Sequence, residues 1–420
     1  MLPGKRYTGP ILDRPSPSLL LAFAMDGALD SRITFTRADS GTRFDYAGVM
    51  QTESSNVARF THDPATYYPS STSNSISRGK KTFAVSYQYT VGAIVQATYD
   101  ASNWMRGTVI AASGSSVTIR VEKTVGSGTY AAWNLIQSLG LLIEESRTNL
   151  LTYSEEFDNA AWAKAGATVT ANTVVAPDGT LTGDKFVEGM ASATPLAYES
   201  YSFTSGTTYT LSLFAKDAGR RYLGVWGGTA FGNGITFFDL QTGTIAYTSG
   251  AVGSSITFVG NGWYRITVTD TAPISASSNV GFQLSVDGTN AAYTGDGTSG
   301  IYIWGAQLEA GSFPTSYIKT TSSTVTRAAG SASMTGADFS DWYNVPAGTF
   351  ILDVVARSGD TILTCGGTTI TADYTGRKKY AVSYSSDQSA SSLVLGDGEF
   401  LSVAYYPSAL SSAWQSYLTS

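Results

Sequence analysis

The sequence predicts an all-β protein of tandem β-sandwich or jelly-roll modules, with a small inserted β unit and one short C-terminal helix. Its composition combines 44 glycines and 25 tyrosines with only 14% charged residues, which favours short strands and tight turns over helices. Apolar and polar residues alternate in many short runs that end at turn dipeptides. The length of 420 residues exceeds one ordinary domain, so several modules are expected.

Charge and cysteine content exclude several classes of protein. A net charge of −6 and a pI near 4.9 argue against a nucleic-acid-binding protein, which would carry a basic face. Cys365 is the only cysteine, so no intrachain disulfide forms and assembly in a reducing cytosol fits. No apolar run reaches the length of a membrane span. The apolar run after Lys5 and Arg6 resembles a short signal peptide, but we interpret Leu19–Met25 as the first strand.

Changes in composition divide the chain into four predicted parts. The first 17 residues hold four prolines and are expected to form an extended arm, and a break at 67–74, which includes Pro69, ends the first part. The predicted parts are an N-terminal arm with short β segments (1–74), a small inserted β domain (75–138), a jelly-roll domain (139–319) and a second β-sandwich (320–420).

The third part has the most regular strand pattern. Alternation marks strands around Leu211, Ile266, Phe282 and Ile303. Turn dipeptides separate these strands at hairpin positions: Asp178-Gly179, Thr242-Gly243, Asn261-Gly262 and Asp287-Gly288. Spacing of this kind is typical of a sandwich or jelly roll. At the chain's end, Leu410, Trp414 and Leu418 lie at helical spacing behind Ser411, which predicts a capped amphipathic helix.

Few residues are available for catalysis. His62 is the only histidine and has no nucleophile motif beside it, so a Ser-His-Asp arrangement is not predicted, and one His with one Cys cannot form a zinc site. Glycoside hydrolysis needs only two carboxylates and stays open as an alternative. The carboxylate candidates are Glu144, Glu145, Glu155, Glu156, Asp184 and Glu188. No enzyme is predicted, because none of these lies in a paired motif on one strand face.

Sugar binding without catalysis needs exposed aromatic rings and a few polar groups. Trp226 is the best candidate, because glycines flank it in place of an alternating core strand. Arg220 and Arg221 could donate hydrogen bonds to an acidic sugar. The other candidate contacts near Trp226 are Tyr198, Tyr201, Tyr222 and Phe231. We assign Trp162, Trp263 and Trp304 to the core. No cofactor is predicted, although Glu156, Asp184 and Asp296 leave a calcium ion open.

Several motifs resemble a module that recurs in phage and prophage structural proteins, including tail and head fibres. They are Gly140–Leu151, Tyr153–Phe157 with Trp162, Gly262–Arg265, and Tyr293–Glu309. Arg32–Ala38 resembles the usual lead-in to that module. Residues 66–138 therefore look like an insertion, and they are similar to a small β unit of phage fibre proteins.

Two further resemblances concern the sandwiches. The central module resembles jelly-roll carbohydrate-binding modules of glycoside hydrolases, in which calcium takes an early Glu and an acid on the final strand. Glu156 matches the first position, but no acid stands near Trp304-Gly305. Residues 401–410 resemble the end of a concanavalin A-like or laminin-G-like sandwich. At about 90 residues that part is short, so it is either trimmed or completed by strands from a neighbour.

These resemblances imply a fibre, spike or decoration protein of a phage virion, assembled in the bacterial cytoplasm, that binds host surface polysaccharide without catalysis. The expected partners are other virion proteins, the glycan, and further copies of the chain, with a trimer as one form open to a fibre. Neither nucleic acid nor membrane is expected. A purely structural capsid or tail protein and a polysaccharide depolymerase are the alternatives.

Overall fold

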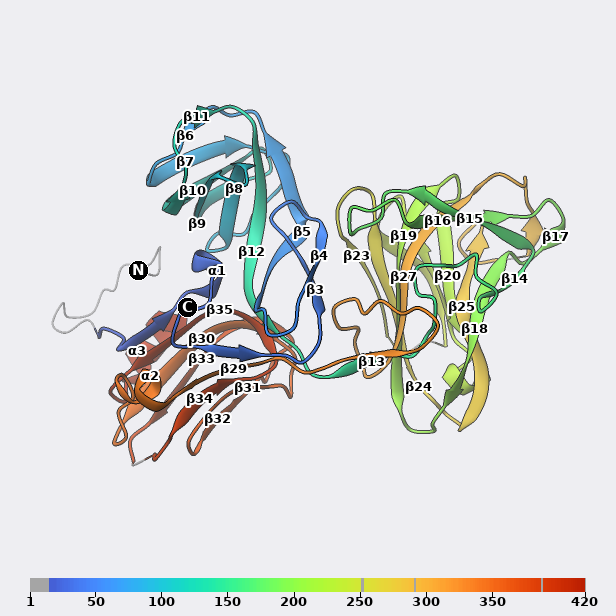
Figure 1. Cartoon of the computed structure of the whole chain (residues 1–420). Helices are drawn as coiled ribbons and strands as arrows, with labels where there is room; N and C mark the ends of the chain where they lie inside the picture. The colour runs from blue at the N-terminus through green and yellow to red at the C-terminus, as the bar shows by residue number, and fades with distance from the viewer. Residues whose placement is uncertain (1–14, 251–252, 291, 387, 420) are drawn as a thin grey trace. The chain divides into compact units, whose positions relative to one another are not determined.

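The structure is a computed structural model that describes residues 15–250, 253–290, 292–386 and 388–419. More than half of the chain is strand and very little is helix, which confirms the predicted all-β class. Figure 1 shows several antiparallel sheets in two compact units. Unit 2 consists of Val49–Gln51 and Ser146–Arg327, and unit 1 of the remainder. The division into four parts stays a prediction; the boundaries of unit 2 lie a few residues beyond 139 and 319.

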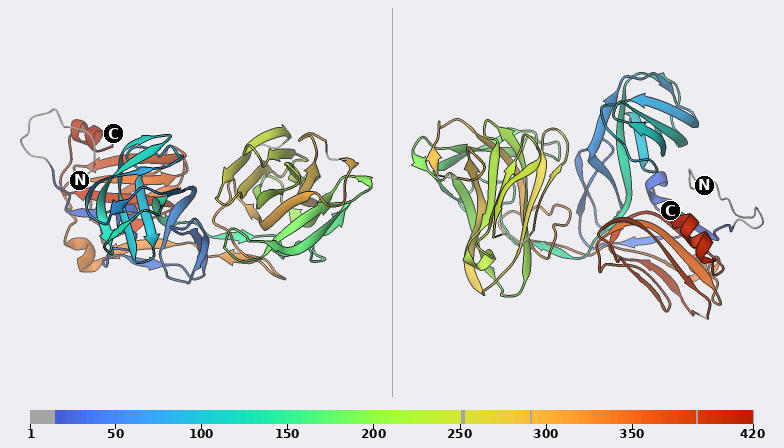
Figure 2. Two further views of the ribbon diagram at one scale, coloured as in Figure 1. Left: turned by 90° about the horizontal axis from the view of Figure 1, so that it is seen from above. Right: turned by 180° about the vertical axis from the view of Figure 1, so that it is seen from behind.

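Unit 2 is a sandwich of two six-stranded antiparallel sheets (Figures 1 and 2). The sheet that we call the Trp226 sheet has the order β14 (Ala163–Ala165), β18 (Leu196–Phe203), β25 (Ala276–Ser285), β20 (Tyr222–Gly227), β21 (Ile235–Asp239), β22 (Thr244–Ser249). The facing sheet, the Trp304 sheet, has the order β15 (Ala167–Val174), β16 (Gly183–Glu188), β27 (Gly300–Ala310), β19 (Thr208–Ala218), β24 (Tyr264–Thr271), β23 (Gly253–Phe258). Smaller elements are β13 (Arg147–Asn149) paired with β28 (Val325–Arg327), β17 (Ser192–Ala193) paired with β26 (Tyr293–Thr294), and the 3-10 turn η1 (Thr229–Phe231).

The two sheets of unit 2 enclose one apolar core. Every second residue of each strand points inward, so Val225 and Phe282 of the Trp226 sheet face Leu213 and Ile303 of the Trp304 sheet. Phe186 packs edge-on against Phe282, with ring centroids 5.2 Å apart. The tryptophans predicted for the interior are each 1% exposed, which confirms their assignment: Trp162, Trp263 and Trp304.

A predicted hairpin turn joins β23 to β24. Asn261 and Gly262 both have positive φ, 52° and 80°, as the two central residues of a type I′ hairpin turn require. The Trp263 N–H donates to the Gly260 carbonyl at 2.9 Å and closes the turn. Asn and Gly adopt this backbone conformation at the lowest cost, which is why the dipeptide marked the turn in the sequence.

Unit 1 contains a long curved sheet and a shorter one. The long sheet has the order β33 (Gly376–Tyr384), β30 (Gly348–Ala356), β35 (Gly398–Tyr406), β12 (Trp133–Ile143), β8 (Ile94–Asp100), β9 (Asn103–Ser113), β10 (Ser116–Val125), β7 (Gly79–Ala84), and β5 (Arg59–Ser70) also pairs with β12. The shorter sheet has the order β2 (Thr34–Thr36), β29 (Ser331–Thr335), β34 (Ser392–Leu395), β31 (Thr361–Cys365), β32 (Thr368–Thr371). The remaining elements are β3 (Gly41–Phe44), β4 (Met50–Glu53), whose first two residues belong to unit 2, β6 (Asn74–Ser75) paired with β11 (Thr129–Tyr130), and the helices α2 (Gly336–Ser340) and α3 (Ser412–Thr419).

The N-terminal strands of the same chain complete the short C-terminal sandwich. β1 (Leu19–Leu21) pairs with β35, and β2 pairs with β29. Leu19, Leu21 and Phe35 are buried in the same core as Phe350 and Val403. The C-terminal part is therefore short because the N-terminal part of the same chain supplies the strands that it lacks.

Two local expectations were wrong, and one lies outside the described residues. The predicted strand Leu19–Met25 ends at Leu21 and continues as the short helix α1 (Phe23–Asp26). The predicted break at 67–74 begins too early, because β5 continues through Pro69 to Ser70. Among the described residues β5 pairs with β12 alone, so it is an edge strand, and an edge strand tolerates a proline that cannot donate a hydrogen bond. The arm of residues 1–17 is described only from residue 15 onward.

The predicted C-terminal helix is confirmed as α3. The Trp414 N–H donates to the Ser411 hydroxyl at 3.4 Å, and Leu410 and Leu418 are buried against β30 and β35 while Trp414 packs at their edge. None of the helices in the described ranges has the length and apolar character needed to cross a membrane.

Candidate functional site

The outer face of the Trp226 sheet collects aromatic side chains that the core does not use. On β20, Leu223 and Val225 point into the core, so alternation turns Tyr222 and Trp226 outward. On β18, Ala197 points inward and Tyr198 outward. Both outward-facing rings near the centre, Tyr198 and Trp226, are partly exposed.

A bare strip of backbone separates these two rings. Tyr198 and Trp226 are both paired with Gly281 of β25, one from each side. Their ring centroids are 6.1 Å apart and their planes are inclined at 56°. A side chain at position 281 would collide with the Ala197 carbonyl oxygen. The surface is therefore lower at this glycine than at the aromatic rings on either side of it.

The aromatic row continues across the sheet. Phe237 on β21 lies over Gly224 of β20, where an added Cβ would meet its ring. Tyr247 on the edge strand β22 follows, 6.5 Å from Phe237 between centroids, and is 43% exposed. Phe237 itself is 1% exposed, so the rings of this face that a ligand can reach are Tyr198, Tyr222, Trp226 and Tyr247.

Unpaired polar groups lie on the same face. The Trp226 Nε1 atom is buried and has no hydrogen-bond partner among the described residues. The Gln283 side chain, across from Gly224, likewise has none among them. The Ser200 hydroxyl donates to Asn279 Oδ1 at 2.5 Å, which leaves the Asn279 amide N–H groups facing outward without a described partner. A buried donor without an acceptor costs free energy unless water or a ligand supplies one.

This arrangement suits an uncharged polar ligand with flat apolar surfaces. Aromatic rings present such surfaces for stacking, and amide and indole groups fix the position of hydroxyl groups. A pyranose ring combines both features, with C–H groups on its faces and hydroxyls on its edge. The outer face of the Trp226 sheet is therefore the candidate site.

The structure places Arg220 in an ion pair at one end of the sandwich. Its guanidinium donates two hydrogen bonds to the carboxylate of Glu188, each 2.5 Å long. The Tyr293 hydroxyl and the Asp296 backbone N–H also donate to Glu188, at 2.6 and 2.7 Å. Burial alone would raise the pKa of Glu188, but hydrogen bonds from Arg220 and Tyr293 outweigh it and hold the pKa below its usual range.

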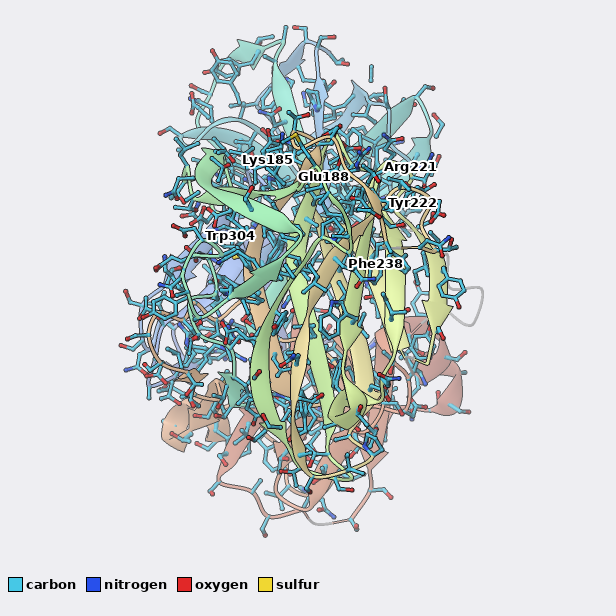
Figure 3. The ribbon with its side chains drawn as sticks, turned by 90° about the vertical axis from the view of Figure 1, so that its right-hand side faces the viewer. Lys185, Glu188, Arg221, Tyr222, Phe238 and Trp304 are labelled. Atoms are coloured by element: carbon cyan, nitrogen blue, oxygen red, sulfur yellow. The ribbon has the colours of Figure 1, made fainter. Side chains whose placement is uncertain are left out.

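Arg221 is also engaged. It donates to Asp239 through Nε and Nη2, at 2.7 and 2.5 Å, and lies 5.1 Å above the Tyr222 ring. Figure 3 shows Lys185, Glu188, Arg221 and Tyr222 at the same end of the unit. Each arginine considered for an acidic sugar therefore already binds a carboxylate of the chain, Glu188 for Arg220 and Asp239 for Arg221, and their contact with a sugar stays a prediction.

Two other predicted contacts belong to the interior. Phe231 is 1% exposed and packs in the core beside Phe203, with centroids 5.5 Å apart. Tyr201 shares the inward side of β18 with Phe203, and it packs edge-on against Tyr209. Phe231 is therefore removed from the candidate contacts, and Tyr201 lies on the wrong side of its sheet. Of the seven predicted residues, the structure brings together Tyr198 and Trp226 on one face, with Tyr222 at its end.

The three acids considered for calcium do not form one site. Asp184 is 1% exposed and accepts the backbone N–H groups of Phe157 and Asn172, and burial raises its pKa to about 6. Glu156 is exposed on a loop, and Asp296 accepts hydrogen bonds within its own turn. No group of three or more metal-ligating side chains occurs in the described ranges.

The carboxylates considered for glycoside hydrolysis are dispersed. Glu188 is bound to Arg220, Glu155 contacts Lys319 and Tyr317, and Glu144 in unit 1 is paired with Arg59. His62, also in unit 1, is 6% exposed. Burial and two arginines lower its pKa to about 3, which keeps the imidazole neutral.

Sequence reasoning missed the glycines and amides of the face. Gly224 and Gly281 form its floor, and Gln283 and Asn279 supply its polar groups. The available signal was Gly281, the second residue of the alternating run Val280–Ser285, where a side chain would otherwise be expected.

Comparison with known proteins finds fold likeness only. No protein-family model and no curated protein matches the chain. A Clostridium thermocellum endo-1,4-β-D-xylanase 10B fragment with CBM22-1 and GH10 modules, complexed with xylohexaose, is 18% identical with a TM-score of 0.26. That match covers 42% of this chain but spans only 30% of the xylanase chain. A tandem CBM22-1–CBM22-2 domain of Paenibacillus barcinonensis Xyn10C is 13% identical with a TM-score of 0.24, over 71% of this chain and 98% of that one. Likenesses this small establish neither a family nor a ligand.

Proposed function

We propose that this chain is a non-catalytic polysaccharide-binding protein of a phage particle surface, and that the outer face of the Trp226 sheet holds the glycan. One observation carries the proposal. Tyr198 and Trp226 flank the bare backbone at Gly281. Stacking on the two rings would orient a sugar above that backbone.

The phage setting of the proposal rests on the sequence motifs. The blocks from Gly140 to Leu151 and from Tyr293 to Glu309 resemble modules of virion fibre proteins. In this setting the chain is a fibre, spike or decoration subunit, located on the virion and bound to other virion proteins. A homo-oligomer, such as a trimer, would multiply weak sites into useful avidity.

The absence of catalysis is part of the proposal. It is supported by the carboxylates, since Glu144, Glu155 and Glu188 are each held by a cation, and by the neutral, buried His62. Release of reducing ends from capsule or lipopolysaccharide by the purified protein would contradict this part and favour the depolymerase.

Trp226→Ala is expected to weaken polysaccharide binding at least tenfold, because it removes one of the two aromatic stacking surfaces beside Gly281. The measurement is binding of labelled protein to host cells and to their purified surface polysaccharide, with and without periodate oxidation of the sugars. Tyr374→Ala is the matched control, because Tyr374 is a 56% exposed aromatic residue in unit 1. Unchanged binding by folded Trp226→Ala protein would reject the face. No binding by the wild type to any host preparation would favour the purely structural role.

A further inference from the structure

Several backbone carbonyl oxygens in unit 2 bind one lysine ammonium group, as such oxygens usually bind a metal ion. Lys164 on β14 extends its ammonium group into the loop between Tyr153 and Trp162. The Nζ atom donates to three consecutive backbone carbonyls, those of Phe157, Asp158 and Asn159, at 2.8, 3.2 and 2.8 Å. These three bonds account for the whole donor capacity of the ammonium group.

The loop is shaped around this ammonium group. The Asn159 N–H donates to Glu156, the Trp162 N–H donates to Asn159, and the Trp162 indole donates to Tyr153. These bonds turn successive carbonyls toward one point, where they would repel each other without a cation between them. Two carboxylates, those of Asp158 and Asp184, act electrostatically on the ammonium group. Burial lowers the pKa of Lys164, and the negative charges of Asp158 and Asp184 oppose that change.

We propose that Lys164 is the built-in cation of this module and occupies a position that would otherwise suit a divalent ion with oxygen ligands. Backbone carbonyls with nearby carboxylates are the donors that calcium takes in proteins. Here the same oxygens already bind an ammonium group, so calcium does not fit the wild-type chain. The inference goes beyond the proposed function, because it concerns what holds the loop and makes no use of the glycan face.

Removing the ammonium group should open the position to a metal. The wild-type melting temperature is expected to be the same in chelator and in millimolar calcium. Lys164→Ala is expected to lower the melting temperature of unit 2 by roughly 5–10 °C in chelator, because three carbonyls lose a charged donor. Calcium is expected to restore at least half of that loss, since metal binding to the folded state adds stability.

Two further variants separate charge from packing. Lys164→Met keeps the length of the side chain without the charge, so it should lose stability and gain nothing from calcium. Lys216→Ala is the matched control, because Lys216 donates to a single carbonyl, that of Asn261, at 2.8 Å, and should change the melting temperature little. Calorimetry of the full chain gives the temperatures, and hydrogen exchange in peptides covering 153–172 shows whether the loop has loosened.

Three results would overturn the proposal. They are calcium-dependent stability of the wild type, full stability of Lys164→Ala in chelator, or a destabilised Lys164→Ala that calcium fails to restore. None depends on glycan binding, so failure here is distinguishable from failure of the proposed function.

Discussion

Arg220→Ala is expected to destabilise unit 2 by about 3 kcal/mol at pH 7, without acting on the aromatic face directly. The side chain of Glu188 is fully buried, and Arg220 supplies its cation, with 22% of the arginine side chain exposed. After the substitution the carboxylate keeps hydrogen bonds from Tyr293 and Asp296 but loses its bidentate partner Arg220. An unpaired buried charge costs more than the pair itself contributes.

The sign of the pH dependence distinguishes this cause from lost packing. In the wild type the pKa of Glu188 is lower in the folded protein than in the unfolded chain. Its ionised carboxylate therefore stabilises the fold at pH values above the pKa of the unfolded chain, and this stabilisation is lost as the pH falls through the pKa of the folded protein. In Arg220→Ala only the hydrogen bonds from Tyr293 and Asp296 oppose the effect of burial, so the pKa of Glu188 is higher than in the wild type. The difference between wild type and variant should therefore be largest near pH 7 and small near pH 3.5.

Urea unfolding at several pH values measures this difference. The shifted transition is assigned to unit 2 by hydrogen exchange in peptides from residues 146–327. Arg221→Ala is the matched control: Arg221 is more exposed, and Asp239 keeps donors from Gln241 and Thr242. Its loss should be smaller. A loss in Arg220→Ala that stays equal at pH 3.5 and pH 7 would show that the ion pair is not its source.

Features set by neighbours in sequence could be predicted from the sequence. The Asn261-Gly262 hairpin needs only the backbone preferences of two residues, and the alternation around Phe282 needs only one strand. Trp304 is buried for another reason: it lies on the face of its sheet opposite to Ile303, where it packs against Phe214 and Tyr317. Trp226 lies in the alternating strand β20, so its alternation with Val225, and not the flanking glycines, turns its side chain outward.

Features set by pairing between distant strands could not be predicted. Tyr198 and Tyr201 differ by an odd number of positions on β18, so they face opposite sides of the sheet, and only the register with β25 shows which is outward. Glu188 at the end of β16 meets Arg220 of the connection between β19 and β20, and the sequence does not mark these two segments as neighbours. The strands that complete the C-terminal sandwich come from the chain's other end, which no local pattern shows.

A second carboxylate of unit 2 should have the opposite effect on stability. Glu199 is 8% exposed on the inner side of β18 and accepts hydrogen bonds from the Thr152 backbone N–H and hydroxyl at 3.2 and 3.3 Å. Burial raises its pKa to about 7, and the bonds from Thr152 offset only part of that shift. No cation is among its hydrogen-bond partners in the described ranges, unlike Glu188 beside Arg220.

Glu199→Gln is therefore expected to stabilise unit 2 above neutral pH. The pKa of Glu199 is higher in the folded protein than its value of about 4.5 in the unfolded chain. Such a carboxyl does not reduce the free energy of unfolding below pH 4.5, but it reduces that free energy increasingly as the pH rises to the pKa of the folded state. That cost reaches about 3 kcal/mol above pH 7. Glutamine keeps the shape and an acceptor for Thr152 without the charge. The variant should match the wild type at pH 4 and exceed it by about 1–3 kcal/mol at pH 8 in urea unfolding. Equal stabilities at pH 8 would mean that Glu199 reaches water, or finds a cation, when it ionises.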